Sequence, residues 1–446
     1  MAITMLAFVR NRSTNALPLL LGLFFKISGT STRVLSMLSN IGVCVSSNTV
    51  ERLKKRISED AIAFAVDLIK SGQLFCVVFD NINIFQRKFQ QRTTNRNSMI
   101  NATNCAIIGI DGADTAAEDL DAKLSMRGNR AQATPRDIFA TQEDDAHMKL
   151  AFEALIADML VRYCPGSTKW EDRTKMLEEI LAAVPTDRPL KAEKTDTRPF
   201  GVFDVNEGSK KGLIKVLEAI RERSTLTVQE WSAKARIIIG DWLTANNLRA
   251  ARRDRTDDVN AMERVDYPEE LSALWHYALQ ATHMIMRTHY GHAVLDPSSL
   301  AAHKGLLHRV WDVNKPNYAA AKALIRHSLI ARLLHIAISK EIGDQFTTTT
   351  AAENAKDGGD DYLAHEIYFI RDALFFCEFE HAISYADAGR HNYARECLEV
   401  LLKWKYELTT ALRTALEKSW FVNRWGIDGR WIPADLYLEQ LNFWVK

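Results

Sequence analysis

The chain has 446 residues, more than one compact core usually holds, so we expect two or three structural units. Hydrophobic residues make up 47% of the chain and charged residues 25%, an ordinary globular composition that excludes a largely disordered protein. The formal net charge of +1 excludes attraction of nucleic acid by the field of the whole molecule, so any DNA contact must use a local basic patch.

The spacing of the cysteines and the hydropathy of the chain limit the cellular compartments in which the protein is expected. The six cysteines are scattered without CxxC pairs, which argues against a disulfide framework or a zinc site and favours a reducing compartment. An apolar run at 16–25 is too short to span a bilayer, and we expect it to form a buried helix. A signal peptide stays open there, because Arg10 and Arg12 precede the run. We expect no membrane contact and an intracellular protein, in the nucleus if it acts on DNA.

Residues 1–72 are expected to form an N-terminal helical region. Residues 32–39 are apolar at helical spacing, Gly42 interrupts them, and a helix with the sequence TVERLKKRIS follows Asn48. A helix, a glycine turn and a second helix outline a helix-turn-helix, whose second helix enters the major groove of DNA. The residues that would contact nucleic acid are Arg52, Lys54, Lys55 and Arg56. A basic helix face exposed to solvent is the alternative interpretation.

Residues 73–255 are expected to hold the β-core. Apolar runs at 74–79 and 105–110 flank a polar stretch at 87–98. This order predicts consecutive antiparallel strands with the two apolar runs at the centre of the sheet.

An insertion at 112–199 is expected to interrupt this core. Residues 111–141 are polar without periodicity, which predicts a loop or a partly disordered segment, and helices at 146–163 and 170–183 follow. The chain then returns through a short strand, an amphipathic helix and a third apolar run, at 200–205, 210–223 and 236–240.

Residues 256–425 are expected to form a helical insertion domain, because the chain looks helical throughout 268–418. The last unit, 426–446, is a predicted helix with a proline in its first turn, where the missing N–H costs nothing. Asp435 and Glu439 are four residues apart and project from one face of that helix. We expect the helix to return these acids to the core.

Two aspartates follow buried apolar runs. Asp80 comes after CVVF and Asp241 after IIIG, and neighbouring strands would bring their carboxylates within reach of one divalent cation. Oxygen ligands of this kind suit Mg²⁺ or Mn²⁺. The third acid would be Glu439, with Asp435 as the other candidate. The alternative is that Asp80 opens a turn and Asp241 caps the helix that follows it.

The predicted order of elements resembles that of DDE transposases, the hAT-like ones in particular. Three strands come first, a strand that carries the second aspartate follows, and an acidic helix comes late in the chain. The resemblance implies an α/β, predominantly helical fold: a ribonuclease-H-like mixed β-sheet core interrupted by a large helical insertion, with the helical region at its N-terminus. It also implies that Asp80, Asp241 and Glu439 are catalytic and bind two metal ions that clamp a phosphodiester.

Several blocks of sequence resemble a large fungal family known only as a domain of unknown function and repeatedly found near mobile elements. The blocks are FDNIN at 79–83, NAT at 101–103, IGDWLT at 239–244, WH at 275–276, RTHYG at 287–291 and ADLYLEQLN at 434–442. The resemblance runs from about Phe8 to the end and implies a transposon-derived protein. Trp242 departs from the family, which usually has glutamine there, beside the expected metal.

Basic residues follow the Asp241 strand. Arg249, Arg252 and Arg253 would place guanidinium groups along a phosphate backbone, although neighbouring aspartates make a salt-bridged, solvated helix the alternative. His276 is expected in the core or at an interface, near the cleft.

The leading hypothesis is a metal-dependent nuclease or transposase. The alternatives are an inactive relative that binds DNA or protein through its helices, and a purely structural helical protein. A homo-oligomer is a further expectation.

Overall fold

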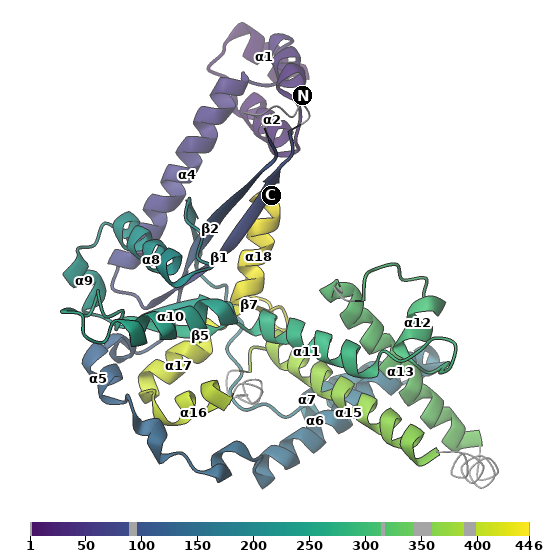
Figure 1. Cartoon of the computed structure of the whole chain (residues 1–446). Coiled ribbons are helices and arrows are strands. Elements are labelled where there is room, and N and C mark those ends of the chain that lie inside the picture. Colours follow the sequence, from purple (N-terminus) through teal and green to yellow (C-terminus); the bar gives the residue numbers. More distant parts are fainter. Residues whose placement is uncertain (1, 89–95, 314–316, 343–358, 388–397, 446) are drawn as a thin grey trace.

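The computed structural model describes residues 2–88, 96–313, 317–342, 359–387 and 398–445. Helices surround one mixed β-sheet, so the expectation of a predominantly helical α/β protein is confirmed (Figure 1). Within these ranges, no helix combines the length and the apolar character that crossing a bilayer requires.

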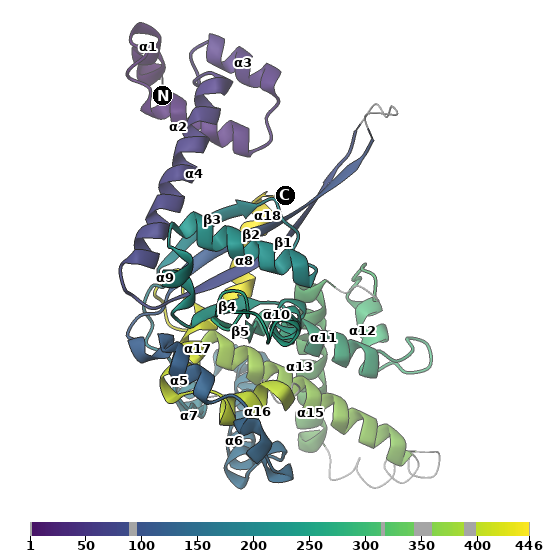
Figure 2. The same ribbon diagram turned by 60° about the vertical axis from the view of Figure 1, so that its left-hand side comes forward.

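The N-terminal region is helical. Its helices are α1 (Ala2–Arg10), α2 (Ala16–Ile27), α3 (Thr32–Asn40) and α4 (Ser47–Lys70). The side chains of Ser31 and Ser46 accept hydrogen bonds from the first turns of α3 and α4, which fixes where both helices begin. Helix α4 is long and joins α1–α3 to the sheet (Figure 2).

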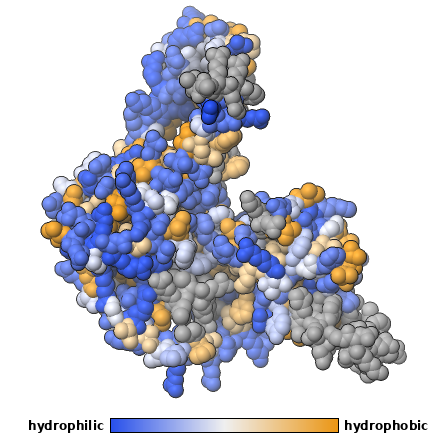
Figure 3. Space-filling view, in the orientation of Figure 1, coloured by the Kyte–Doolittle hydropathy of each residue, from blue (hydrophilic) through white to orange (hydrophobic). Residues whose placement is uncertain are grey.

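Helix α2 is less buried than its sequence predicts. Only Pro18 and Gly22 are fully buried in it, while Leu20 and Phe24 are 65% and 63% exposed. The expectation of a buried helix is therefore wrong for most of its side chains, because α1, α3 and α4 cover one narrow face. In Figure 3, apolar residues lie among hydrophilic ones on this part of the surface.

The sheet has five strands in the order β3-β2-β1-β4-β5. The strands are β1 (Phe75–Gln86), β2 (Ser98–Gly109), β3 (Thr197–Phe203), β4 (Arg236–Gly240) and β5 (Pro268–Ser272). Strand β2 is antiparallel to β1 and β3, whereas β4 is parallel to both β1 and β5. The two apolar runs expected at the centre are the buried parts of β1 and β2, so that prediction is confirmed.

Both faces of the sheet are covered, which explains why three consecutive isoleucines form the centre of β4. On one face, Val77, Phe79 and Ile238 pack with α4, α8, α9 and α10. On the other face, Cys76 and Ile239 pack with the large helical part of the chain. The three helices that follow β3 and β4 are α8 (Lys210–Ser224), α9 (Val228–Ser232) and α10 (Trp242–Asp254).

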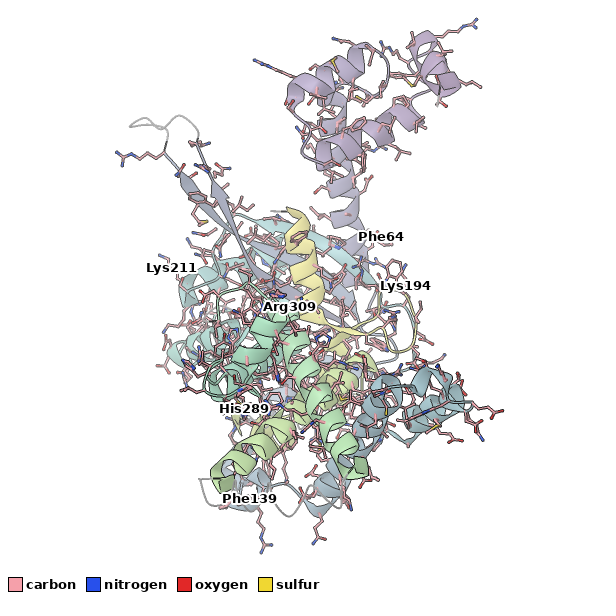
Figure 4. All side chains as sticks on the ribbon, turned by 90° about the vertical axis from the view of Figure 1, so that its right-hand side faces the viewer. Phe64, Phe139, Lys194, Lys211, His289 and Arg309 are labelled. Carbon is pink, nitrogen blue, oxygen red and sulfur yellow. The ribbon has the colours of Figure 1, made fainter. Side chains whose placement is uncertain are left out.

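Helix α4 is held against β3 by an arginine. The Arg198 guanidinium lies 3.8 Å from the centroid of the Phe64 ring and donates a hydrogen bond to the Phe64 carbonyl oxygen. Figure 4 labels Phe64 on α4 beside the sheet.

The large helical part is built from two stretches of the chain. The first stretch contains η1 (Thr115–Glu118), α5 (Leu120–Ser125), η2 (Asn129–Gln132), η3 (Pro135–Ile138), α6 (Gln142–Tyr163), η4 (Ser167–Lys169) and α7 (Arg173–Ala183). The second contains α11 (Leu274–His289), α12 (Leu300–Leu306), α13 (Tyr318–Ile342), α15 (Gly359–Ser384), α16 (Leu398–Tyr406) and α17 (Thr410–Ser419). A two-stranded ribbon of β6 (Phe421–Val422) and β7 (Ile432–Pro433) leads into the last helix, α18 (Ala434–Val445).

The expectation of a loop or partly disordered segment over 111–141 is wrong. The segment contains short helices, and the buried Glu118 accepts hydrogen bonds from Arg236 at 2.7 Å and Lys234 at 2.6 Å. The segment is ordered by partners more than a hundred residues away, which its own polar composition does not reveal.

The expectation of helix throughout 268–418 is wrong at its start, where PEELS forms β5 at the edge of the sheet. Glu269 and Glu270 are buried there because Lys403 lies 2.5 Å and 2.9 Å from their carboxylates. Lys123 adds a contact to Glu269 at 3.3 Å, so cations from two other segments allow a charged sequence to be a buried strand.

Lys403→Met is expected to destabilise the protein by about 3 kcal/mol, because it leaves part of the charge of two buried glutamates uncompensated. Urea unfolding at neutral pH measures this loss. Lys55→Met is the matched control, since that lysine is exposed and pairs with the exposed Glu59 on the same helix. Equal stability of the two variants would contradict the assignment.

Candidate functional site

The register of the sheet brings Asp80 and Asp241 side by side. Val78 of β1 pairs with Ile239 of β4 in parallel register, and each aspartate lies two residues further along its own chain. Neighbouring strands are about 5 Å apart, so the two carboxylates project from the same face of the sheet at the same position along the strands. Asp80 lies within β1, and Asp241 follows the last residue of β4.

Asp241 also caps a helix. Its carboxylate accepts a hydrogen bond from the Thr244 backbone N–H at 2.6 Å, at the start of α10. The capping role considered from the sequence is thus confirmed, and it fixes the orientation of the side chain without using all of its oxygen lone pairs.

Helix α18 brings Glu439 to Asp80. Burial raises the pKa of Asp80 to about 7, together with a side-chain hydrogen bond to Glu439 and the charge of that residue. Asp80 therefore keeps its proton up to near neutral pH. His276 acts in the opposite direction, because its positive charge favours ionised Asp80.

A chain of amides fixes α18 to the sheet at this point. Asn104 of β2 donates to the Asn442 side-chain oxygen at 2.9 Å, and the Asn442 amide donates to Asp80 at 3.2 Å. Asn442 is fully buried, so this contact sets the position of Glu439 one turn earlier on the same helix.

Glu207, a residue that the sequence did not single out, adds a fourth carboxyl group. It lies between β3 and α8, is 2% exposed, and its backbone N–H donates to the Asn81 side-chain oxygen. Burial raises its pKa well above the usual range, and the charges of Asp80 and Asp241 raise it further. One of its carboxyl oxygens has no hydrogen-bond partner among the described residues. The only sequence signal was an acid after a short strand, which Asp204 shares.

Asp435 has a different role from Glu439. Its carboxylate accepts hydrogen bonds from the backbone N–H groups of Trp275 and His276 at 3.2 Å and 3.1 Å, at the start of α11. It also contacts Nδ1 of His276 at 2.9 Å. These three contacts fix Asp435 against α11, and Glu439 is the acid of α18 that reaches Asp80.

His276 is held facing the acids by Asp435. Burial alone would lower the pKa of His276, but the hydrogen bond and charge of Asp435, with the charges of Asp80 and Asp241, raise it above its usual value. The imidazole is therefore positively charged over a wider pH range than a free histidine.

Asp435→Asn is expected to lower the pKa of His276, since the amide keeps the helix-capping oxygen but removes the charge. The shift can be followed by NMR titration of the imidazole signal. Asp257→Asn, an exposed acid, serves as the control. An unchanged titration of His276 in Asp435→Asn would contradict the proposed pairing.

The donor set fits a hard divalent cation in its chemistry. Asp80, Glu207, Asp241 and Glu439 supply only carboxylate oxygens, and none of them forms an ion pair with lysine or arginine within the described part of the chain. As the side chains stand, no three or more His, Cys, Asp or Glu residues among those described are arranged to hold a metal ion. Binding of a metal ion would therefore require Asp80 to lose its proton and the carboxylates to move closer together.

The basic residues near Asp241 divide into different roles. Arg252 is partly buried, donates to the Pro268 carbonyl oxygen at 2.7 Å and pairs with Glu270 at 2.8 Å, so contacts within the protein engage its guanidinium group. Arg249 is half-buried and lines a small cavity beside Glu270. Arg253 is exposed.

The cations of α4 are exposed, and most lie beside acids. Lys54 pairs with Glu51, Lys55 with Glu59 and Arg56 with Asp60, each three or four residues away on the same helix. Such pairs are typical of a solvated, basic helix face, which is the alternative to a DNA-recognition helix. Arg52 is exposed on the same helix.

Comparison with known proteins places the chain in a family. Residues 128–446 match the model of a family of unknown function, DUF6589, whereas curated proteins and solved structures gave no match. The matched region contains Glu207, Asp241, His276 and Glu439, and Asp80 lies before it. Because the match covers well over half of the sequence, the chain belongs to the DUF6589 family.

Proposed function

We propose that this protein is transposon-derived and transposase-like, and that Asp80, Asp241 and Glu439 bind Mg²⁺ or Mn²⁺ and act on phosphodiester bonds of DNA. One observation carries the proposal. Residues far apart in the sequence meet on one face of the sheet, where Glu439 hydrogen-bonds to Asp80 and Asp241 lies at the level of Asp80 on the neighbouring strand.

The topology supports a ribonuclease-H-like core. Three antiparallel strands precede the strand that leads to Asp241, and a late helix carries Glu439, as in DDE transposases. Helices α11–α17 lie between β5 and α18, which is the position of the helical insertion in hAT-like transposases. Figure 1 shows α18 returning along β1 and β2 after this insertion.

The residues of the site have separable tasks. Bound divalent cations would supply Lewis acidity and an activated oxygen nucleophile. Asp80 would lose its proton to become a ligand beside Glu439, and Asp241 is oriented for the same purpose by its bond to Thr244. His276, oriented by Asp435, presents a proton and a positive charge toward the substrate phosphate.

The proposal is tested by nicking of supercoiled plasmid and of hairpin DNA with Mn²⁺ or Mg²⁺. Asp241→Asn is expected to lower the rate at least about 100-fold, because loss of a direct ligand exceeds the loss seen for outer-shell partners. Asp257→Asn is the matched control and should cut like the wild type. Equal rates in Asp241→Asn and wild type would exclude this site as the source of cleavage.

A second candidate is an inactive relative that binds DNA or protein. It is favoured by Trp242, which is 54% exposed beside Asp241, and by the absence, among the described side chains, of a ready metal-ligand group. A wild-type protein that binds DNA but neither binds Mn²⁺ nor cuts would select this candidate. Association into homo-oligomers and a nuclear location stay predictions.

A further inference from the structure

Beyond Ile82, β1 and β2 leave the body of the protein as a two-stranded arm. We call residues 83–88 and 96–101 the hairpin arm. Ile82 is fully buried, whereas Asn83 and Phe85 on β1 and their partners Asn101 and Met99 on β2 are exposed. Figure 2 shows the hairpin projecting away from the helices, and Figure 4 shows it from another side.

The hairpin arm carries positive charge without negative charge. The sequence has no Asp or Glu from Asn81 to Ile110. Arg87, Lys88 and Arg96 lie in the arm, and none of them forms an ion pair with the residues that the structure describes. The cations of α4 differ in this respect, since acids on the same helix accompany them. In a protein of net charge +1, the arm is therefore a local basic surface of the kind that phosphate attracts.

The shape and side chains of the arm suit duplex DNA. The major groove of B-DNA admits a two-stranded β-ribbon. The cross-strand partners Asn83 and Asn101 present exposed amide groups on the arm, and amides pair with adenine in that groove. Phe85 and Met99 are cross-strand partners and offer an apolar contact for thymine methyl groups.

The arm also points back to the carboxylate site. Asp80 and Arg87 belong to the same chain segment, seven residues apart, which corresponds to roughly 24 Å along a strand. That length equals about seven base-pair steps of DNA. A duplex of that length lying along the arm would therefore span the distance from Arg87 to Asp80.

We propose that the hairpin arm binds duplex DNA in its major groove, with Arg87, Lys88 and Arg96 contacting phosphates, and that it holds DNA against the carboxylate site. Binding of DNA by the arm stands on its own. The delivery of that DNA to Asp80 rests on the proposed function.

The test is fluorescence anisotropy of a labelled duplex DNA with the full chain over a range of salt concentrations. The triple variant Arg87→Gln, Lys88→Gln, Arg96→Gln should bind at least about tenfold more weakly at low salt. The slope of log K against log salt should fall by about 2–3, since each phosphate contact contributes about 0.9. Arg87 and Arg96 are exposed and Lys88 is half-buried, and an unchanged melting temperature confirms that the variant is folded.

A matched control removes the same charge elsewhere. Lys149→Gln, Lys169→Gln and Lys175→Gln change exposed lysines on α6, η4 and α7 and should leave binding nearly unchanged. An equal loss in both triple variants, or wild-type affinity in the arm variant, would overturn the proposal. So would a wild type that does not bind duplex DNA, or an arm variant that loses only self-association.

Two further measurements sharpen the test: the first concerns the groove, and the second separates the arm from the metal site. Duplex RNA should bind more weakly than DNA, because the major groove of an A-form helix is narrow, and equal affinity would overturn major-groove binding. Mn²⁺ binding should be the same in wild type and arm variant. Arm-dependent DNA binding without Mn²⁺ binding would support the arm and reject the metal site, and the reverse result would do the opposite.

Discussion

Asp80→Asn is expected to be more stable than the wild type at pH 8, by about 1–3 kcal/mol. Burial and Glu439 raise the pKa of Asp80 to about 7, so the folded state holds this proton more tightly than the unfolded chain does. The stability that the proton adds is fully present below about pH 4 and is lost as the pH rises through 7. Asparagine carries no charge at any of these pH values and avoids the loss.

Urea unfolding of both proteins at pH 4.5 and pH 8 measures this effect. The difference in free energy of unfolding should be small at pH 4.5 and should favour the variant at pH 8. Asp257→Asn, an exposed acid, controls for the loss of a surface charge. A less stable Asp80→Asn at pH 8 would show that the ionised carboxylate is satisfied in the native protein and would contradict the raised pKa. Stability gained by removing a functional acid is the usual trade-off at active sites.

The affinity for Mn²⁺ is expected to rise about tenfold per pH unit up to pH 7 and to level off above it, about 100-fold in total from pH 5. The cation competes with the proton on Asp80, and above the pKa of about 7 that residue has no proton left to displace. His276 adds to the trend in the same direction, because its positive charge opposes cation binding until it is lost.

Calorimetric titrations in buffers of different ionisation enthalpy measure both the affinity and the protons released. Near pH 6 the wild type should release about one proton per ion bound, and near pH 9 almost none. The matched variant Asp435→Asn should weaken the contribution of His276 while Asp80 still titrates. An affinity independent of pH would contradict the proton on Asp80 as the competitor of the metal.

The strands with apolar sequences could be predicted from the sequence, and those with charged sequences could not. The buried parts of β1 and β2 and the three isoleucines of β4 are runs of β-forming residues, because helices cover both faces of the sheet there. Strand β5 has the sequence PEELS, and its glutamates are neutralised by Lys403, which is more than a hundred residues away. The same kind of distant partner, Arg236, orders Glu118 in a segment whose composition suggests a loop.

The candidate site was predictable in its strand acids but not in its supporting residues. Asp80 and Asp241 were found because each follows an apolar run on a neighbouring strand. Asp435 and Glu439 share a helix face, so only the structure shows that the first binds the start of α11 and the second reaches Asp80. Glu207 could not be recognised, because its burial depends on the packing of the segment between β3 and α8 against β1.

The central claim is that Asp80 belongs to a divalent metal site, and titration calorimetry of Mn²⁺ at pH 8 tests it most directly. The full-length wild type and Asp257→Asn should bind alike, and Asp80→Asn should bind at least about 100-fold more weakly despite its greater stability. A wild type without Mn²⁺ binding, or an Asp80→Asn variant that binds as tightly as the wild type, would contradict the claim.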